Sequence, residues 1–394
     1  MLVKLCSLLG LVMAAPSIVS ADALYAVTDL GDPGAGFVYV NATSLNDNGD
    51  VTGYVSNSAA RGTGFDREHV FLYTGNQMVD LGAFGYRNGL GYGINNAGQI
   101  AGVVNDPLNG VGRAFVYSGG LITYLGTLGG DTSAAFGIND HGAVTGISST
   151  ADGQAHAFLY SNGRLMDLGT LTGCCVSAGF AINNGGQVTG NVSVPGSVSG
   201  NAFLYTNGRM IDIDTLGGQY SFGLAINSAG QVTGFAEPPG SGFRAFLYTD
   251  GQMINLGTLG GGASLGAAIN DRGEITGRSG TLAGVEHAFL YTDGHMVDLN
   301  TLIDPSLGLT LTDAPAINNK GQIVAEGDRP FGPTHAYLLT PVPEPSTLAL
   351  FAIPLSALLL WLRTDRRVSP LPQPTANLSA ATQTRKSNQA VPRG

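Results

Sequence analysis

The sequence predicts an all-β chain that folds as a β-propeller of seven four-stranded blades. A unit of about 44 residues recurs seven times along the 394-residue chain. Each unit contains four short segments of β-favouring residues separated by turn signals. The chain also opens with a lone copy of the unit's fourth segment and closes with a unit that lacks one. Four-stranded repeats of about 40–45 residues are typical of propeller blades.

The first two segments of the unit are joined by a short turn. The first segment ends in an Ile-Asn pair, and the second has the form GQVTG. Sequences such as NAG and NGG stand between them and place glycine where a left-handed backbone is needed. The pairs are Ile94-Asn95, Ile138-Asn139, Ile182-Asn183, Ile226-Asn227, Ile269-Asn270 and Ile317-Asn318, with Leu45-Asn46 as a variant.

The third and fourth segments form a hairpin. The third has the form HAFLY, a short apolar run that favours a strand. The fourth has the form MVDLG. The sequences SNG, TNG and TDG separate them, and Asn-Gly or Asp-Gly supplies the positive φ angles of a tight hairpin.

The two ends of the repeat region predict how the last blade is completed. Residues 25–31, YAVTDLG, are an isolated fourth segment, and residues 335–340, HAYLLT, are a third segment with no partner after it. We therefore expect the first strand to pair with the last blade, which closes a ring and hides its sheet edges. A linear stack of the same units is the alternative, and it would not need the displaced first strand.

Composition and charge narrow the range of partners. Charged residues make up 12% of the chain, hydrophobic residues 43%, and 60 residues are glycine, as expected for many short strands and tight turns. Residues 22–345 contain 11 basic and 27 acidic side chains, a net charge of −16. Such a surface repels nucleic-acid phosphates, so nucleic-acid binding is not expected.

The N-terminus has the features of a secretory signal peptide over residues 1–21. Lys4 precedes an apolar stretch that ends in small residues, with cleavage expected after Ala21 or, alternatively, after Ala23. Cys6 would suggest a lipoprotein anchor, but Lys4 interrupts the apolar box that such an anchor needs. Cleavage leaves only Cys174 and Cys175, either as a vicinal disulfide or as two thiols.

Histidines recur at one position of the unit, and a converging ring of them would indicate a metal site. The equivalent positions of other units hold Arg113, Asn201 and Arg244. Blades of a ring also hold this position apart, so we expect a structural role and no metal or cofactor. The four histidines are His69, His156, His287 and His335.

Carboxylates give no catalytic constellation either. One series precedes the Leu-Gly of the fourth segment, too scattered for the close acid/base pair of a glycosidase. The NDNGD of residues 46–50 faintly resembles a calcium loop, but most other units lack carboxylates there, which favours a hairpin turn. No GxSxG elbow or phosphate-binding loop is present, so we do not expect an enzyme. The series is Asp29, Asp80, Asp167, Asp212 and Asp298.

The connections of the unit vary on one side only. The loop between the second and third segments and the link to the next unit differ in length and sequence, as in residues 54–68, 235–243 and 300–313. Both leave the blade at the rim opposite the two tight hairpins. Binding residues concentrate on variable loops held by a rigid scaffold, so we expect ligands at this variable rim.

The C-terminus carries a second targeting signal over residues 341–367. A Pro-Glu-Pro motif precedes about sixteen apolar or small residues, 347–362, a span of roughly 24 Å if helical. We expect a short transmembrane helix whose arginines stay on the cytoplasmic side. Residues 368–394 are rich in Pro, Ser, Thr, Ala and Gln and are expected to be disordered. The motif residues are Pro343, Glu344, Pro345, Arg363, Arg366 and Arg367.

This arrangement closely resembles the PEP-CTERM sorting signal of Gram-negative bacteria. The resemblance implies an exosortase-type partner in the inner membrane, processing at Pro343–Pro345, and release to the cell surface or the extracellular matrix. It also implies an association with exopolysaccharide and biofilm. The tail after Arg367 departs from the family pattern, since such signals usually end soon after the arginines.

The body, residues 24–340, resembles the HAF-repeat family of extracellular proteins through motifs such as His156-Ala157-Phe158 and His287-Ala288-Phe289. The family implies location and repeat architecture but no activity. The sequence therefore favours an exported, non-enzymatic protein that binds or organises exopolysaccharide. The alternatives are a propeller enzyme, of glycosidase or lyase type, acting on extracellular polysaccharide, and a matrix filler without a specific ligand.

Overall fold

The computed structural model describes residues 24–31, 34, 36–57, 67–106, 110–171, 176–193, 200–328 and 334–343. These residues belong to one compact unit, which extends to Val342, and to the first residue of the segment that follows it. They are almost entirely β-strand and turn, and their only helices are two short 3₁₀ turns, η1 (Leu299–Thr301) and η2 (Pro305–Leu307). Within these ranges no helix is long and apolar enough to cross a membrane. The predicted transmembrane helix, residues 347–362, lies outside them.

The strands fall into seven repeats that follow the sequence units. Repeat 1 contains β2 (Tyr39–Leu45), β3 (Val51–Ser56), β4 (Glu68–Thr74) and β5 (Gln77–Gly82). Repeat 2 contains β6 (Asn88–Ile94), β7 (Ile100–Asp106), β8 (Val111–Ser118) and β9 (Leu121–Tyr124). Repeat 3 contains β10 (Gly129–Ile138), β11 (Val144–Thr150), β12 (Ala155–Ser161) and β13 (Arg164–Gly169).

The remaining repeats have the same order of strands. Repeat 4 contains β14 (Ser177–Ile182), β15 (Val188–Ser193), β16 (Gly200–Thr206) and β17 (Arg209–Asp212). Repeat 5 contains β18 (Ser221–Ile226), β19 (Val232–Ala236), β20 (Arg244–Thr249) and β21 (Gln252–Asn255). Repeat 6 contains β22 (Gly260–Ile269), β23 (Ile275–Thr281), β24 (Glu286–Thr292) and β25 (His295–Asp298). Repeat 7 contains β26 (Thr310–Ile317), β27 (Ile323–Asp328) and β28 (Thr334–Pro341).

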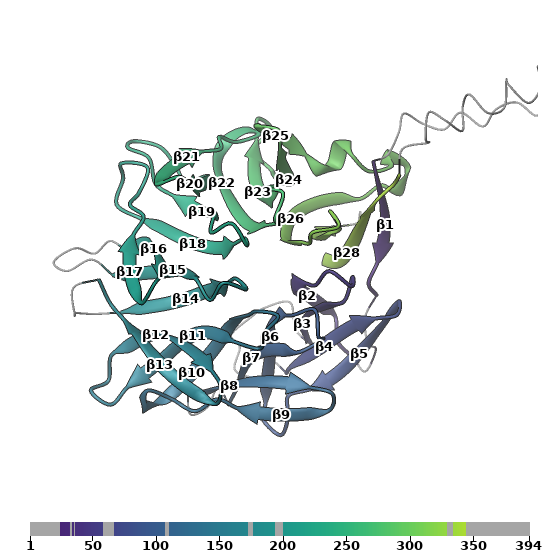
Figure 1. The fold of residues 1–394 in the computed structure, drawn as a ribbon. Coiled ribbons are helices and arrows are strands. Elements are labelled where there is room, and N and C mark those ends of the chain that lie inside the picture. The colour runs from purple at the N-terminus through teal and green to yellow at the C-terminus, as the bar shows by residue number, and fades with distance from the viewer. Residues whose placement is uncertain are drawn as a thin grey trace, which may run out of the picture. The chain divides into compact units, whose positions relative to one another are not determined.

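The fourth strand of the last sheet comes from the other end of the chain. β1 (Tyr25–Asp29) pairs antiparallel with β28, with Tyr25 opposite Pro341 and Asp29 opposite Tyr337. Figure 1 shows β1 beside β28, at the edge of the sheet formed by repeat 7. This sheet has the order β1-β28-β27-β26. In the sequence, almost the whole repeat region lies between its outer strand β1 and its other three strands.

Six sheets are formed, where the sequence predicts seven separate ones. Five contain four strands each, and the sixth contains the eight strands of repeats 1 and 2. A single parallel pair, Glu68 with Asn88, joins the two halves of this larger sheet. Within each half the strands pair antiparallel in chain order, as they do in the other repeats.

The core lies between neighbouring repeats. The aromatic residue of the HAFLY segment is at most 1% exposed in every repeat: Phe71, Phe115, Phe158, Phe203, Phe246, Phe289 and Tyr337. One cluster packs Ala101 and Ala114 of repeat 2 against Val144 and Phe158 of repeat 3. Another packs Val324 of repeat 7 with residues of repeat 1, so the core also continues from the last repeat to the first.

The last glycine of GQVTG is required because the backbone of the neighbouring strand lies very close to it. A Cβ placed on Gly190 would lie 1.8 Å from the carbonyl oxygen of Ala178 on the neighbouring strand. The same distance is 1.8–2.0 Å at Gly53, Gly102, Gly146, Gly234 and Gly277. Repeat 7 has Ala325 here, and the register of its two inner strands shifts between Asp313 and Ala316.

The hairpins have the predicted turn geometry. Their central residues have φ angles of 51–52° at Asn162, Asn207, Asp250 and Asp293, and the glycine after each also has positive φ. This backbone matches the twist of the flanking strands.

Candidate functional site

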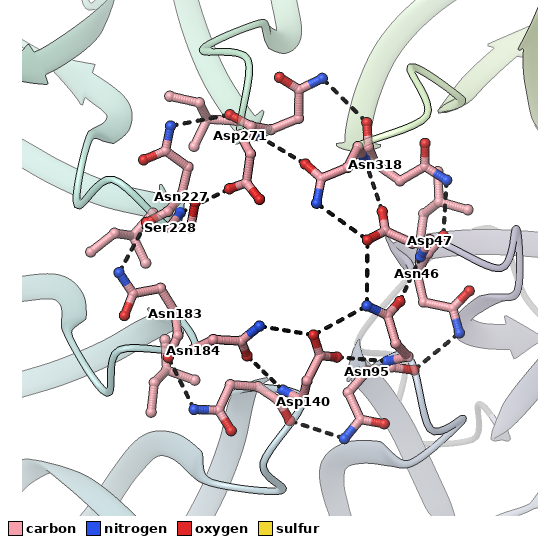
Figure 2. Close-up of a pocket in the computed structure, with 18 of the residues that line it drawn as sticks. Asn46, Asp47, Asn95, Asp140, Asn183, Asn184, Asn227, Ser228, Asp271 and Asn318 are labelled. Carbon is pink, nitrogen blue, oxygen red and sulfur yellow. Dashed lines mark hydrogen bonds between the residues drawn. The ribbon is translucent and has the colours of Figure 1, made fainter.

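The six Ile-Asn pairs and the Leu45-Asn46 pair meet around one polar opening (Figure 2). Each asparagine amide donates a hydrogen bond to the main-chain carbonyl of the equivalent asparagine in the next repeat, at 2.9–3.2 Å. The last of these bonds runs from Asn318 back to Asn46, so the series is circular. We call this set the asparagine belt: Asn46, Asn95, Asn139, Asn183, Asn227, Asn270 and Asn318, all 3–6% exposed.

The local sequence uses every polar atom of a belt asparagine, as Asn95 shows. Its Oδ1 accepts hydrogen bonds from the main-chain N–H groups of Ala97 and Gln99, at 3.1 and 2.9 Å. Its Nδ2 donates to Gln99 Oε1 at 2.8 Å as well as to the carbonyl of Asn139. Gly98, with a φ of 72°, lets the chain turn between these partners. A buried amide with all its bonds made is stabilising and rigid.

The sequence pattern of this segment predicts a turn and does not indicate the belt. Asn46 and Asp50, the weak calcium candidate, are bonded to each other at 3.0 Å, and Asn46 Oδ1 also accepts from the Asp50 N–H. The available signal was asparagine at one position in all seven units, although the turn itself requires only the glycine.

A second ring lies one residue further along the chain. The main-chain N–H of each residue donates to the side-chain oxygen of its counterpart in the next repeat, at 2.8–2.9 Å in six steps. Within the described chain the exception is the step from Asn184 to Ser228, whose side chain is shorter. We call this set the outer ring: Asp47, Asn96, Asp140, Asn184, Ser228, Asp271 and Asn319.

The outer ring lowers the pKa of one of its carboxyl groups, that of Asp140. Burial alone would raise the pKa of Asp140, but hydrogen bonds from Asn184 and Asn96 outweigh it and leave that pKa below its usual value. Asn184 Nδ2 donates to Asp140 Oδ2 at 2.9 Å, and Asn96 Nδ2 donates to the same oxygen at 3.1 Å. A carboxyl with a lowered pKa is poorly suited to act as a general acid near neutral pH.

This pKa predicts how acid affects stability. Because the folded pKa of Asp140 is lower than its unfolded value, ionised Asp140 stabilises the fold above about pH 4. That contribution is lost as the pH falls through the folded pKa. Asp140→Asn should therefore lose less stability than the wild type between about pH 4 and pH 2, measured as urea midpoints at each pH. The same acid dependence in both proteins would contradict this account.

The opening leads from a mouth lined by polar side chains to a throat whose lining side chains are mostly apolar. Belt and outer ring line a mouth of about 230 Å³. A second cavity of about 200 Å³ shares Leu45, Ile94 and Ile138 with it and is otherwise mostly apolar. On one side of the throat Phe136 lies between Tyr92 and Phe180, with ring centroids 5.3 and 5.6 Å apart.

The recurring histidines do not converge. Each instead pairs through Nδ1 with the aspartate of the fourth strand in its own sheet, at 2.6–3.3 Å. Asn201 makes the same contact with Asp212 at 2.9 Å. Within the described residues no group of three or more His, Cys, Asp or Glu could hold a metal ion. The pairs are His69–Asp80, His156–Asp167, His287–Asp298 and His335–Asp29.

The sequence contained a signal for these pairs. The two members are eleven residues apart in repeats 1, 3, 4 and 6, and where arginine replaces histidine, tyrosine or asparagine replaces the aspartate. Considered as two separate series, the histidines and the aspartates do not indicate that each histidine pairs with the aspartate of its own sheet. Exposed pairs of this kind contribute little to stability.

Two carboxylates stand opposite each other in repeat 7 but point to different neighbours. Asp313 pairs with Glu326 in the ladder, yet Asp313 accepts from Arg278 of repeat 6 at 3.1 Å. Glu326 accepts from Asn41 of repeat 1 at 2.6 Å. Burial raises the pKa of Asp313, whereas the Arg278 guanidinium opposes that rise.

The predicted binding face carries exposed aromatic side chains. At the variable rim of repeat 5, Phe235 stacks on Phe222 with ring centroids 4.8 Å apart, and Phe243 meets Phe235 edge-on at 5.1 Å. Phe243 is 40% exposed. The mouth lies on the opposite rim, at the turns between first and second strands, where sequence analysis predicted no site.

Most residues of the two targeting signals lie outside the described ranges. Pro343 is described and exposed. The other residues of the two signals lie outside the described ranges: Ala21, Glu344, Pro345, Arg363, Arg366 and Arg367. Cys174 and Cys175 also lie outside them.

Comparison with known structures defines the class of protein. The β-propeller domain of the Trilobed protease from Pyrococcus furiosus matches with a TM-score of 0.52 at 9% identity, over 77% of this chain and 93% of that one. That domain has an open velcro topology, whereas β1 pairs with β28 here. The Pyrococcus horikoshii acylaminoacyl peptidase matches with a TM-score of 0.49 at 12% identity, over 80% of this chain and 54% of that one.

The chain is therefore an all-β protein of the β-propeller class. At such identities the likeness concerns the fold alone. No family model matches the chain, and no curated protein matches it.

Proposed function

We propose that this chain is an exported, non-enzymatic propeller of seven blades that binds exopolysaccharide at its variable rim. Export rests on the N-terminal signal peptide, and release to the cell surface or matrix rests on the PEP-CTERM resemblance with its exosortase partner. The C-terminal helix would hold the chain in the inner membrane only until processing.

The number of blades is supported by the repeats themselves. Repeats 1 and 2 share a sheet only through the Glu68–Asn88 pair, so each half is equivalent to one blade. Closure of the ring is supported by the β1–β28 ladder and by the Asn318–Asn46 bond of the belt. A closed ring supplies the rigid scaffold that a loop-based binding site needs.

The observation that carries the binding proposal is the difference between the two rims. At the mouth, the polar side chains are largely bonded to one another from repeat to repeat. At the variable rim, Phe243 and Tyr124 are 40% and 42% exposed. Exposed aromatic rings on a scaffold are typical anchors for a ligand with apolar faces and polar edges, as a sugar ring has.

Loop replacement tests this function. The full-length protein is screened against cell-derived polysaccharides, and residues 57–67 and 237–243 are then each replaced by a short turn. We expect polysaccharide binding to be lost while the thermal midpoint stays close to that of the wild type. Asn207→Asp, in a hairpin on the opposite rim, is the control and should bind normally.

Three results would count against the proposal. Unchanged binding after loop replacement would remove the variable rim as the site. Cleavage of the polymer by the purified protein would favour the enzyme alternative. Failure to bind any cell-derived glycan would favour a matrix filler.

A further inference from the structure

We propose that the variable rim at repeats 1 and 2 binds the carboxylate groups of an acidic polysaccharide. This inference rests on the proposed function and specifies its ligand class. The site is a set of basic and aromatic side chains that we call the arginine–tyrosine patch: Arg67, Tyr86, Arg87, Arg113 and Tyr124.

One hollow forms the centre of the patch. Arg67 and His69, next to and within β4, line it together with Tyr86 and Arg87 from the link between β5 and β6. The Glu68–Asn88 pair holds these two segments side by side. The hollow measures about 540 Å³, which falls within the range usual for ligand sites.

Aromatic contacts extend the patch into repeat 2. The rings of Tyr86 and Tyr124 meet edge-to-face, with centroids 6.0 Å apart and an interplanar angle of 69°. The Tyr124 hydroxyl donates to the carbonyl of Phe84 at 3.4 Å, which helps to orient an exposed ring. Rigid tyrosine rings provide contact area at a low cost in conformational entropy.

Repeat 2 also has arginine in place of the histidine and tyrosine in place of the aspartate. The positions that hold a His–Asp pair in repeats 1, 3, 6 and 7 hold Arg113 and Tyr124 here. Arg113 is exposed. Burial raises the pKa of the Tyr124 hydroxyl, and the nearby positive charge of Arg113 opposes that rise. The carboxylate that repeats 1, 3, 4, 6 and 7 have at this position of the rim is therefore absent from repeat 2, as it is from repeat 5, which has Asn255.

Charge selects the ligand. Among the side chains that the structure describes, Glu68 and Asp80 are the carboxylates next to these arginines in the strands, and Asp80 is bonded to His69 and to the N–H of Gly82. The body as a whole carries a net charge of −16, so an acidic polymer is repelled elsewhere, including by the carboxylates of the mouth. The guanidinium fork matches a carboxylate in a two-bond geometry that lysine cannot reproduce.

Binding to defined polymers tests this assignment. Full-length protein is titrated with polygalacturonate, with neutral dextran and with dextran sulfate. We expect polygalacturonate to bind best, and to bind weakly at about 1 M salt, where the Debye length is about 3 Å. The triple variant R67Q/R87Q/R113Q should bind it at least about tenfold more weakly.

Two further variants show whether binding depends on this patch or only on the net charge of the protein, and whether a loss of binding comes from misfolding. R164Q/R209Q removes two exposed arginines from hairpins on the opposite rim and should bind like the wild type. Y124A keeps all the arginines and should still weaken binding. Each variant is compared with the wild type by its thermal midpoint, which should be unchanged.

The outcomes are distinct. Wild-type affinity in the triple variant, equal weakening in R164Q/R209Q, or equal binding of dextran sulfate would each overturn the carboxylate site. If a neutral cell-derived glycan binds and the triple variant is unaffected, the proposed function stands and this inference fails. If no polysaccharide binds, both fail.

Discussion

Replacing Gly190 by alanine is expected to destabilise the protein by at least about 3 kcal/mol, because the new methyl group meets backbone rather than a flexible side chain. The Cβ would lie 1.8 Å from the carbonyl oxygen of Ala178 and 2.8 Å from the ring of Phe203. Neither can move without breaking the ladder or the buried contact between repeats. The effect is measured as the change in free energy of unfolding in urea.

A matched glycine provides the control for this prediction. Gly262 also lies in a strand, its φ is not in the left-handed region, and a Cβ there would have no atom within 4 Å. Gly262→Ala should therefore stay within about 0.5 kcal/mol of the wild type. Equal stability of the two variants would show that β14 and β15 do not approach as closely as described.

The second large effect is expected at the asparagine belt. Asn183→Ala removes the bonds from Nδ2 to the carbonyl of Asn227 and to Gln187 Oε1, and leaves the Gln187 N–H without its Oδ1 acceptor. Buried groups left unpaired cost about 1–3 kcal/mol each, so a loss of about 3 kcal/mol is expected. Asn183→Asp should cost at least as much, because it turns a carboxylate oxygen toward two acceptors.

The outer ring supplies the comparison for the belt. Asn184→Ser copies the residue that repeat 5 already has at this position, Ser228. It should cost less than about 1 kcal/mol, since Asn184 is exposed. If Asn183→Ala were as mild as Asn184→Ser in urea unfolding, the belt would not be a stabilising element.

Much of the fold follows from local chemistry that repeats. Asn-Gly and Asp-Gly pairs predict the hairpins, and the structure gives Asn162, Asn207, Asp250 and Asp293 the positive φ that such turns require. The buried aromatic residue of each HAFLY-type segment, tyrosine in repeat 7 and phenylalanine in the others, likewise follows from a short apolar run. The all-β propeller class was predictable on these grounds.

What could not be predicted depends on contacts between repeats. The belt joins residues 43–49 positions apart, and its last bond joins Asn318 to Asn46 across 272 positions. Turn chemistry explains the glycine near each belt residue but does not indicate where the asparagine amide points. The patch at repeats 1 and 2 likewise depends on Tyr86 meeting Tyr124 across a repeat boundary.

The number of sheets shows the same limit on a smaller scale. One backbone pair, Glu68 with Asn88, is enough to merge two units that the sequence pattern separates. Local propensity cannot specify whether a link between repeats forms one such pair, because the pairing depends on how closely the two sheets approach.

A disulfide cross-link between the two ends of the repeat region tests ring closure most directly. Ala26 and Thr340 lie opposite each other in the β1–β28 ladder, and both are exposed. With Cys174 and Cys175 replaced by serine, A26C/T340C should oxidise to an intramolecular disulfide in nearly all molecules and raise the thermal midpoint. A26C/S161C, with its second cysteine in repeat 3, should not cross-link within a molecule. Free thiols or only intermolecular dimers in A26C/T340C would contradict a closed ring.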